Sequence, residues 1–256
     1  MTLLDVQDLR VAFGPTEVVR GVSFQIQAGE KLALVGESGS GKTITALSLL
    51  GLVANARTLG TARLQGRDLL ALSEPQWREV RGGDVAMVFQ EPMTALNPLM
   101  TVGDQIAEIF RIKKALPARQ SIEQAIGLLG SVGLPEPEMK ARAYPHQLSG
   151  GQRQRVVIAM ALASEPKLLL ADEPTTALDV TLRVQILDLL STLQRERGMA
   201  VLLITHDLQL VRQFADRVAV MERGVVVEQG AVADVFARPR HPYTRKLLDS
   251  RPRRDA

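Results

Sequence analysis

The chain contains no cysteine among its 256 residues. This absence excludes a disulfide framework and a thiolate metal site, and it fits a reducing cytoplasm. The chain also lacks any run of about 18 apolar residues, the length that a membrane-spanning helix needs. Its first residues show neither the basic nor the apolar segment of a signal peptide. We therefore expect any membrane-spanning part to be supplied by another polypeptide.

A strong excess of charge of one sign is missing as well. The net charge is +3, and the basic residues are scattered among acidic ones, so we expect no nucleic-acid partner. The one small basic cluster, Arg251–Arg254, is typical of a solvated tail. Apolar residues make up 46% and charged residues 23% of the chain, which is ordinary for a soluble globular protein with a sizeable core.

Compact apolar runs predict strands that are covered on both faces of a parallel sheet. Helical patterns at 43–52, 180–197 and 207–215 alternate with them, which indicates a doubly wound α/β fold. The four apolar runs are Glu30–Val35, Val85–Gln90, Lys167–Asp172 and Met199–Thr205.

Two parts of the chain depart from this alternation. Short alternating stretches in residues 1–30 and 59–70 predict an N-terminal antiparallel β subdomain, and residues 217–228 predict a late hairpin. Residues 91–162 carry helical patterns and no convincing strand, which predicts an inserted helical subdomain. We expect one domain over 1–256, with a core at about 1–90 and 163–235, the helical subdomain at about 91–162, and a C-terminal tail at about 236–256.

A phosphate-binding loop follows the first predicted parallel strand. The residues Gly36-Glu37-Ser38-Gly39-Ser40-Gly41-Lys42-Thr43 match the pattern G-x-x-x-x-G-K-[ST] in full. Glycines let the backbone wrap a phosphate chain with its N–H groups pointing inward, and the following helix presents its positive end to the same anion. Lys42 would contact the β- and γ-phosphates, and the Thr43 hydroxyl would bind Mg²⁺. The loop alone does not distinguish a kinase from a GTPase or an ATPase.

Two carboxylates end the strand predicted at Lys167–Asp172. An Asp at the end of a strand beside a phosphate loop can hold Mg²⁺, and Asp172 is the candidate. Glu173 is placed to activate an attacking water as a general base. An isolated Asp-Glu-Pro would be a solvated acidic turn, and the phosphate loop makes the catalytic interpretation the stronger one.

A second anion site is predicted where Ser149-Gly150-Gly151-Gln152 opens a helix. Ser149 is a natural N-cap, and two glycines expose backbone N–H groups at a positive helix end. An ordinary capped helix explains Ser149 but not two glycines in a first turn, where glycine weakens a helix.

Taken together, Leu148–Gln152, the phosphate loop and the strand-end carboxylates resemble the motifs of the ABC ATPases, a family with a P-loop NTPase fold. Other residues fall in the order of that family, although each alone would be an ordinary solvated or core residue. They are Gln90 in the position of the Q-loop, Ala177-Leu178-Asp179 in that of the D-loop, His206 as the switch histidine, and Phe13 as the aromatic that stacks on adenine.

The resemblance implies ATP and Mg²⁺ as cofactors and two such domains paired head to tail. ATP would lie between the phosphate loop of one domain and Ser149, Gly150, Gly151 and Gln152 of the other. Gln90 would join Thr43 and Asp172 at Mg²⁺ and link the site to a membrane subunit. His206 would contact the γ-phosphate and orient Glu173, and Asp179 would cross the dimer seam.

Three further stretches resemble the ATPases of bacterial peptide and nickel importers, especially the N-terminal half of fused importers with two ATPase domains. They are Gln90–Pro98, Tyr144–Leu148 and His241–Thr244. This resemblance implies two transmembrane permease subunits, a periplasmic substrate-binding protein that acts indirectly, and a peripheral location at the cytoplasmic face of the inner membrane. Because the chain has no cysteine, the iron–sulfur cluster of some single-domain relatives is excluded.

Alternatives to a peptide importer remain open. A nickel or metal-chelate importer would share these motifs. A non-transport ABC ATPase of DNA repair would carry sustained heptads, which are not visible here, and a ribosome-associated one would carry two ATPase halves. A non-hydrolysing partner is disfavoured because Lys42, Asp172, Glu173 and His206 are all present. An exporter is disfavoured because exporter ATPases are commonly fused to membrane spans.

Overall fold

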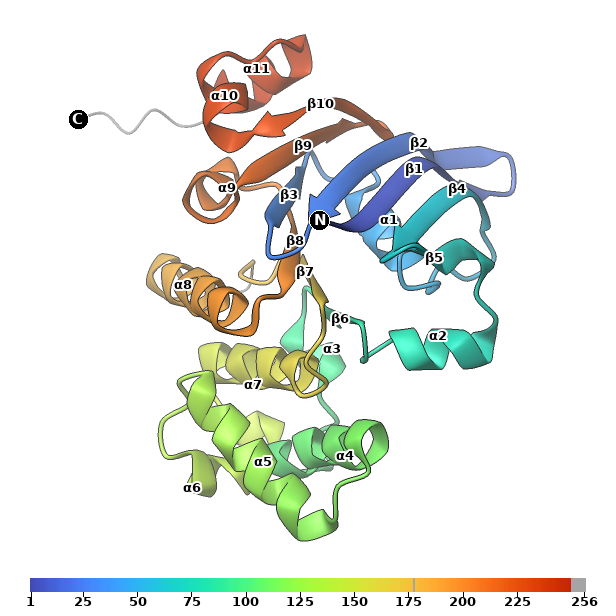
Figure 1. Cartoon of the computed structure of the whole chain (residues 1–256). Helices are drawn as coiled ribbons and strands as arrows, with labels where there is room; N and C mark the ends of the chain where they lie inside the picture. The colour runs from blue at the N-terminus through green and yellow to red at the C-terminus, as the bar shows by residue number, and fades with distance from the viewer. Residues whose placement is uncertain (177, 250–256) are drawn as a thin grey trace, which may run out of the picture. The chain divides into compact units, whose positions relative to one another are not determined.

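The computed structural model describes residues 1–176 and 178–249 (Figure 1). The basic cluster Arg251–Arg254 and Ala177, the first residue of the predicted D-loop, lie outside these ranges. The chain forms two compact units, Met1–Trp77 with Ala200–Ala256, and Arg78–Met199.

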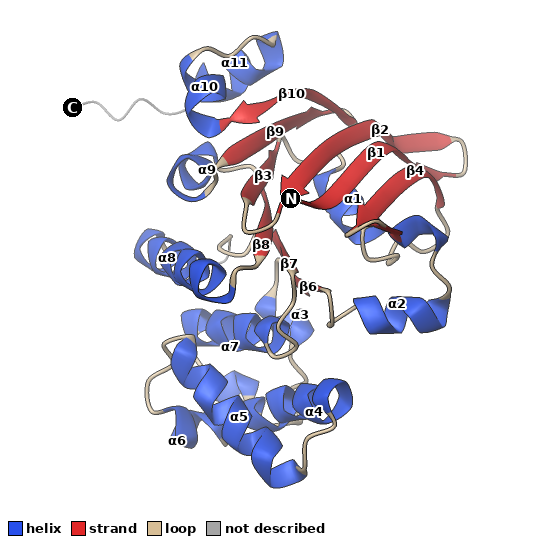
Figure 2. Ribbon diagram, viewed as in Figure 1, coloured by secondary structure: helices blue, strands red, loops and turns tan. Residues whose placement is uncertain are grey.

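An antiparallel sheet forms the N-terminal part of the first unit, as the alternating pattern predicts. In β2, the buried side chains of Val22, Phe24 and Ile26 alternate with exposed Ser23 and Gln25. Figure 2 shows β1, β2 and β4 side by side. The sheet order is β2 (Thr16–Gln27), β1 (Thr2–Phe13), β4 (Arg57–Leu64) and β5 (Arg67–Asp68), and a 3-10 turn at Leu69–Ala71 follows.

The parallel strands of the first unit bring three carboxyl ends to one edge. β3 (Lys31–Val35) pairs in parallel with β8 (Ala200–Thr205) on one side and β9 (Arg217–Glu222) on the other. In this register Val35 lies opposite both Thr205 and Val220. Residues that follow β3 and β8 therefore emerge next to each other.

The predicted late hairpin joins β9 to β10 (Val225–Ala231) in an antiparallel pair. Its two connecting residues, Arg223 and Gly224, have φ values of +46° and +88°. Two successive left-handed residues are typical of a type I′ turn, whose twist matches that of the paired strands. This turn is the reason for the sequence Glu-Arg-Gly between the two apolar runs.

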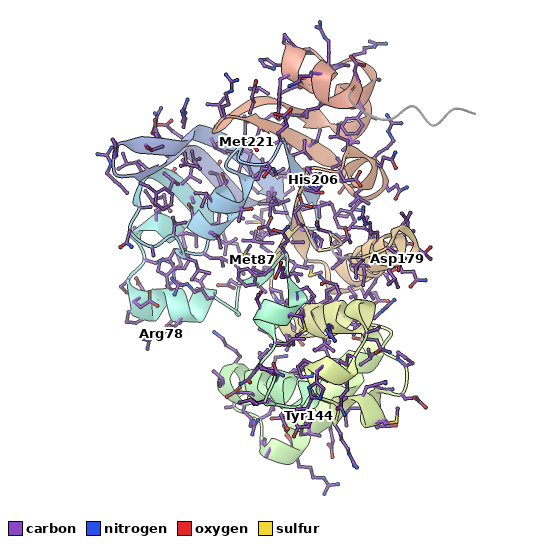
Figure 3. The ribbon with its side chains drawn as sticks, turned by 180° about the vertical axis from the view of Figure 1, so that it is seen from behind. Arg78, Met87, Tyr144, Asp179, His206 and Met221 are labelled. Carbon is purple, nitrogen blue, oxygen red and sulfur yellow. The ribbon has the colours of Figure 1, made fainter. Side chains whose placement is uncertain are left out.

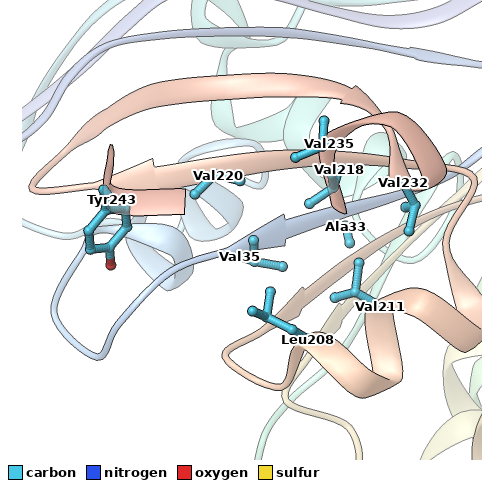
Figure 4. Packing of buried hydrophobic residues seen from close by; sticks show 9 residues of the cluster. All are labelled: Ala33, Val35, Leu208, Val211, Val218, Val220, Val232, Val235 and Tyr243. Atoms are coloured by element: carbon cyan, nitrogen blue, oxygen red, sulfur yellow. The ribbon is translucent and has the colours of Figure 1, made fainter. Parts of the chain in front are cut away.

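Three C-terminal helices bury apolar side chains against β3 and β9 in the first unit (Figure 4). They are α9 (Leu208–Phe214), α10 (Val232–Ala237) and α11 (Pro242–Asp249). The cluster consists of Ala33, Val35, Leu208, Val211, Val218, Val220, Val232, Val235 and Tyr243. The region 236–256, predicted as a tail, thus contains a helix that contributes Tyr243 to the core.

Helix α1 spans Lys42–Ser48 and ends earlier than the predicted 43–52. The N–H of Leu52 donates to the carbonyl of Leu47 at 3.0 Å, and that of Gly51 donates to Ser48 at 3.1 Å. Gly51 has a φ of +60°. These paired bonds around a left-handed glycine form a Schellman motif, which ends the helix although the following residues are apolar.

The second unit contains one parallel strand pair, β6 (Val85–Val88) with β7 (Leu168–Asp172). Residues 91–162, all of them described, contain helices and no strand, in agreement with the predicted pattern. Helices α4, α5, α6 and α7 pack on one another (Figure 2). Over the described residues, none of the helices combines the length and apolarity that a membrane span requires. The helices are α3 (Pro92–Ala95), α4 (Val102–Lys114), α5 (Ala118–Ser131), α6 (Pro137–Ala141), a 3-10 turn at Pro145–Gln147, α7 (Gly150–Leu162) and α8 (Val180–Arg197), with α2 (Glu74–Val80) where the chain passes from the first unit to the second.

Candidate functional site

The loop between β3 and α1 has a backbone that only glycine allows at three positions. Gly39 and Gly41 have φ values of +80° and +101°, a region that other residues rarely adopt. A Cβ atom on Gly36 would lie 2.1 Å from the carbonyl oxygen of Met221 in β9, well inside contact distance. The glycines of the motif are therefore fixed by local geometry, and the loop keeps a wrapped shape.

Lys42 turns back into this loop. Its Nζ donates to the carbonyl oxygens of Gly36 at 2.8 Å and Glu37 at 2.9 Å, and to the Ser40 hydroxyl at 3.4 Å. The side chain is buried, with 7% of its surface exposed. These three acceptors are neutral. Phosphate oxygens would bind the ammonium more strongly, because hydrogen bonds between charged partners are the stronger ones.

His206 directly follows β8, so the strand register brings it next to the phosphate loop in the first unit. Its neighbours are anchored: the Asp207 carboxylate accepts from the backbone N–H of Gln209 at 2.8 Å, and Thr205 is buried. The His206 side chain itself is exposed (Figure 3). His206 and the phosphate loop thus follow neighbouring strands of the first unit.

Phe13 lies at the end of β1, at the turn of the β1–β2 hairpin, and is half-buried. The same hairpin approaches the phosphate loop, since a Cβ on Gly41 would lie 3.0 Å from the carbonyl oxygen of Val18. The ring of Phe13 therefore belongs to a hairpin that contacts the phosphate loop.

In the second unit, Ser149 caps α7 through a reciprocal pair of hydrogen bonds. Its hydroxyl accepts from the N–H of Gln152 at 3.3 Å, and the Gln152 side chain accepts from the N–H of Ser149 at 3.0 Å. A Cβ on Gly151 would lie 3.3 Å from Leu182 of α8, whereas among the described residues one on Gly150 would meet only Leu178, at 3.9 Å. Packing therefore explains Gly151 but not Gly150. Ser149 and Gly150 remain exposed at the helix tip.

The carboxylates of Asp172 and Glu173 differ in their surroundings. Asp172 ends β7 and is buried, with 4% exposed. Glu173 has a φ of +47°, which is uncommon for a residue with a side chain, and its Oε2 accepts from the Thr176 hydroxyl at 2.8 Å. Such a backbone costs on the order of 1–3 kcal/mol and is found preferentially at functional sites.

Asp179 and Gln90 are both exposed in the second unit. Asp179 precedes α8 (Figure 3), and its carboxylate accepts from the N–H of Leu182 at 2.9 Å, which makes it the N-cap of that helix. Gln90 lies two residues beyond the end of β6. The predicted strand Val85–Gln90 is thus shorter, because its last two residues face solvent.

Sequence reasoning did not include Tyr243 and Lys246 in the site. The N–H of Glu37 in the phosphate loop donates to the Tyr243 hydroxyl at 3.0 Å, and Lys246 pairs with the Glu37 carboxylate at 3.3 Å. The sequence pattern that includes Tyr243 is the stretch His241–Thr244, and this stretch indicated a subfamily but not a contact with the phosphate loop.

Two family models match the chain. The one described as "ABC transporter" covers residues 19–176, and the one described as "Oligopeptide/dipeptide transporter, C-terminal region" covers residues 227–256. Among curated proteins, the chain is 54% identical to the peptidoglycan transport ATP-binding protein YejF of Agrobacterium fabrum, over 98% of this chain and 47% of that protein. It is 49% identical to the dipeptide transport ATP-binding protein DppD of Bacillus subtilis, over 99% of this chain and 78% of that protein. The chain thus spans about half the length of the first relative and more than three quarters of the second.

Solved structures give the same result. An ATP-binding cassette in a dimeric, post-hydrolysis state bound to ADP and Pi has a TM-score of 0.79 and 28% identity, over 90% of this chain and 98% of that one. A Clostridium perfringens protein that is part of the ABC transporter complex cbiONQ has a TM-score of 0.81 and 29% identity, over 93% and 91% of the two chains.

Proposed function

Because this chain belongs to the ABC transporter family, we propose that it is the ATP-hydrolysing subunit that powers a peptide importer. The family model matches more than half of the chain, and a relative at 49% identity covers almost all of it. The family and the P-loop ATPase fold that the motifs predict are therefore confirmed. ATP binding and hydrolysis are the chemistry of this domain, and the roles of single residues below are part of the proposal.

The observation that carries the proposal is the position of Lys42 inside the phosphate loop. ATP would enter with its phosphates along Glu37, Ser38, Gly39, Ser40 and Gly41, and the Lys42 ammonium would exchange its neutral acceptors for the β- and γ-phosphate oxygens. Phe13 would stack on the adenine, because its hairpin touches Gly41.

The residues available for Mg²⁺ are hard oxygen donors, the type that this ion prefers. We propose the Thr43 hydroxyl, the Asp172 carboxylate and the Gln90 amide oxygen. The described residues hold no group of three or more His, Cys, Asp or Glu side chains suited to a metal. Thr43, Asp172 and Gln90 would therefore serve an ion that takes most of its ligands from phosphates and water. When bound, Mg²⁺ would neutralise charge on the phosphate oxygens.

Glu173 is proposed as the general base for hydrolysis. Its carboxylate would accept a proton as water attacks the γ-phosphorus, and the left-handed backbone would aim it. His206, exposed beside the phosphate loop, would contact the γ-phosphate and orient Glu173.

A second ATPase domain is needed to complete the site. We propose that Ser149, Gly150, Gly151 and Gln152 bind the γ-phosphate of an ATP held by a partner, and that Asp179 lies at the seam. The exposed helix tip supports this, and so does the absence, among the described residues, of a close neighbour that would exclude a side chain at Gly150. The 28% identical cassette, described as a dimer with ADP and Pi, supports it as well. The partner is a second copy, a different ATPase chain or a fused half.

Peptides are the proposed cargo. The C-terminal region shared with oligopeptide and dipeptide transporters, and the names of the relatives, favour peptides over nickel. Two permease subunits and a periplasmic binding protein would then complete the transporter, with this chain peripheral at the cytoplasmic face of the inner membrane.

Glu173→Gln tests the proposed chemistry. We expect single-turnover ATP hydrolysis to fall by on the order of 10²-fold or more, because the amide cannot accept the proton, while ATP binding persists. Glu136→Gln is the matched control, since Glu136 is also a left-handed glutamate, with a φ of +50°. Hydrolysis by Glu173→Gln at the wild-type rate would show that Glu173 is not the base.

A further inference from the structure

Helix α11 contacts the phosphate loop through the hydroxyl of Tyr243. The Tyr243 oxygen accepts the N–H of Glu37 at 3.0 Å, and these residues are 206 positions apart in the sequence. In Figure 4 the Tyr243 ring lies at one end of the apolar cluster, with its hydroxyl pointing away from β10 toward the loop that follows β3.

The peptide group between Gly36 and Glu37 is held at both ends. Its carbonyl, on Gly36, accepts from Lys42 at 2.8 Å, and its N–H, on Glu37, donates to Tyr243. If Lys42 moves to the phosphates of ATP, the carbonyl end is released. The Tyr243 hydroxyl would then still fix the orientation of this peptide.

We propose that Tyr243 is a positioning residue of the nucleotide site and that α11 is the element that presents it. This inference rests on the proposed function, namely ATP binding by the Gly36–Thr43 loop. A loop whose first peptide is already oriented loses less conformational freedom when it wraps the phosphates, so it binds them more tightly.

Helix α11 is anchored well enough for this role. The Glu228 carboxylate of β10 accepts from the N–H groups of Arg240 at 2.8 Å and His241 at 3.0 Å, directly before the helix. The Tyr243 ring is buried, with 7% exposed, and Leu247 and Leu248 pack against the same cluster. The hydrogen bonds to Glu228 and the packing of the ring in the apolar cluster therefore fix the position of the Tyr243 hydroxyl.

The second contact between α11 and the loop is much weaker. Lys246 and Glu37 form an ion pair at 3.3 Å, but their side chains are 69% and 56% exposed. Water screens such a pair, and exposed pairs contribute little. The Tyr243 hydrogen bond is different, because its loss would leave a partly buried N–H without an acceptor. We therefore assign the positioning effect to Tyr243.

Tyr243→Phe in the full chain tests the inference, because it removes the hydroxyl and keeps the ring in the core. Tyr144→Phe is the matched control, since Tyr144 is the only other tyrosine of the chain and is exposed. Titration calorimetry with Mg²⁺ and a non-hydrolysable ATP analogue measures affinity. NMR measures hydrogen exchange of the Glu37 amide without nucleotide, a readout that a purely structural role in the core would not change.

We expect Tyr243→Phe to bind the analogue roughly two- to tenfold more weakly, the effect of about one hydrogen bond. Exchange of the Glu37 amide should accelerate, and Tyr144→Phe should match the wild type in both measurements. Equal affinity of Tyr243→Phe and wild type, or an unchanged Glu37 amide, would overturn the positioning role. A wild-type chain that binds no ATP analogue would instead refute the proposed function.

Should Tyr243→Phe not fold at the assay temperature, Glu228→Gln tests the same idea from the other end of the anchor. It weakens the acceptor for the N–H groups before α11 without touching the loop. Weaker binding of the analogue is expected, and wild-type affinity together with wild-type exchange at Glu37 would overturn the inference.

Discussion

Two glycines in neighbouring helices of the second unit should respond to alanine with opposite signs. Gly103 lies in the first turn of α4 and is buried, whereas Gly127 lies inside α5 and is exposed. A Cβ on Gly103 would lie 2.6 Å from the carbonyl oxygen of Ala141 and 2.9 Å from its Cβ. A Cβ on Gly127 would meet no atom of the described part of the chain within 4 Å. Packing therefore opposes Gly103→Ala, whereas the effect of Gly127→Ala depends on helix propensity.

The magnitudes follow from these surroundings. The nearest atom to a new Cβ on Gly103 belongs to the backbone of α6, so α4 or α6 has to shift, and overpacking of this kind costs about 1–3 kcal/mol. Alanine at an exposed helix interior lowers the entropy of the unfolded chain and stabilises by roughly 0.5–1 kcal/mol relative to glycine. At about 2–4 °C per kcal/mol for a chain of this size, Gly127→Ala should raise the melting temperature by a few degrees and Gly103→Ala should lower it.

Thermal and urea unfolding of the two variants and the wild type measure this difference. Since both glycines belong to the same unit, one transition reports on both. A Gly103→Ala variant as stable as wild type would mean that α4 and α6 are not in close contact at this point. A less stable Gly127→Ala variant would mean that this face of α5 is covered.

Two further outcomes concern the site, and a third concerns the anchor of α11. Gly36→Ala should abolish ATP binding and destabilise the fold by about 1–3 kcal/mol, because its Cβ would lie 2.1 Å from the Met221 carbonyl oxygen, and calorimetry with the ATP analogue measures this. Ser149→Asp should keep the N-cap of α7 but place a negative charge at the proposed γ-phosphate site, so we expect wild-type stability with loss of ATP-dependent dimerisation in light scattering; retained dimerisation would contradict the role of Ser149. Burial would raise the pKa of Glu228, but hydrogen bonds, including those from Arg240 and His241, lower it below its ordinary value of 4.5. Its contribution to stability is therefore present above about pH 4.5 and lost as pH falls through the folded-state pKa, and the difference in unfolding free energy between wild type and Glu228→Gln should shrink over that range.

Local patterns were sufficient for most elements of the fold. The helix predicted at 180–197 is α8 with the same limits, and the apolar runs at 30–35 and 199–205 are β3 and β8 within one residue. These elements depend on periodicity and burial, which neighbouring residues encode. The ends of elements depend on capping as well as on periodicity. Helix α1 stops at Ser48 because Gly51 closes a Schellman motif, although the apolar pattern continues.

Helix α2 was not predicted, although its start carries a recognisable signal. The backbone N–H and hydroxyl of Ser73 both donate to the side chain of Gln76, at 2.9 and 3.0 Å, and Pro75 lies in the first turn. Ser followed three residues later by Gln, with an early proline, is a helix start. The contact of Tyr243 with Glu37 is different. No local pattern links two residues 206 positions apart, so only the folded chain reveals it.

Ser149 and Asp179 each have a local role in the fold besides the role proposed for them at the nucleotide site. Each was predicted from family order to serve a nucleotide or a dimer seam, and each caps the helix that follows it. A cap requires only a side-chain oxygen that reaches the N–H two or three residues on, so threonine or asparagine would serve the helix as well. The helix alone therefore does not determine these residue types. Gly150 differs from them, because glycine weakens the first turn of a helix and no atom of the described residues lies closer than 3.9 Å to a Cβ at this position. Close approach of a phosphate to the backbone is the demand that would select glycine there, and it is the same demand that the proposed partner-held ATP would make.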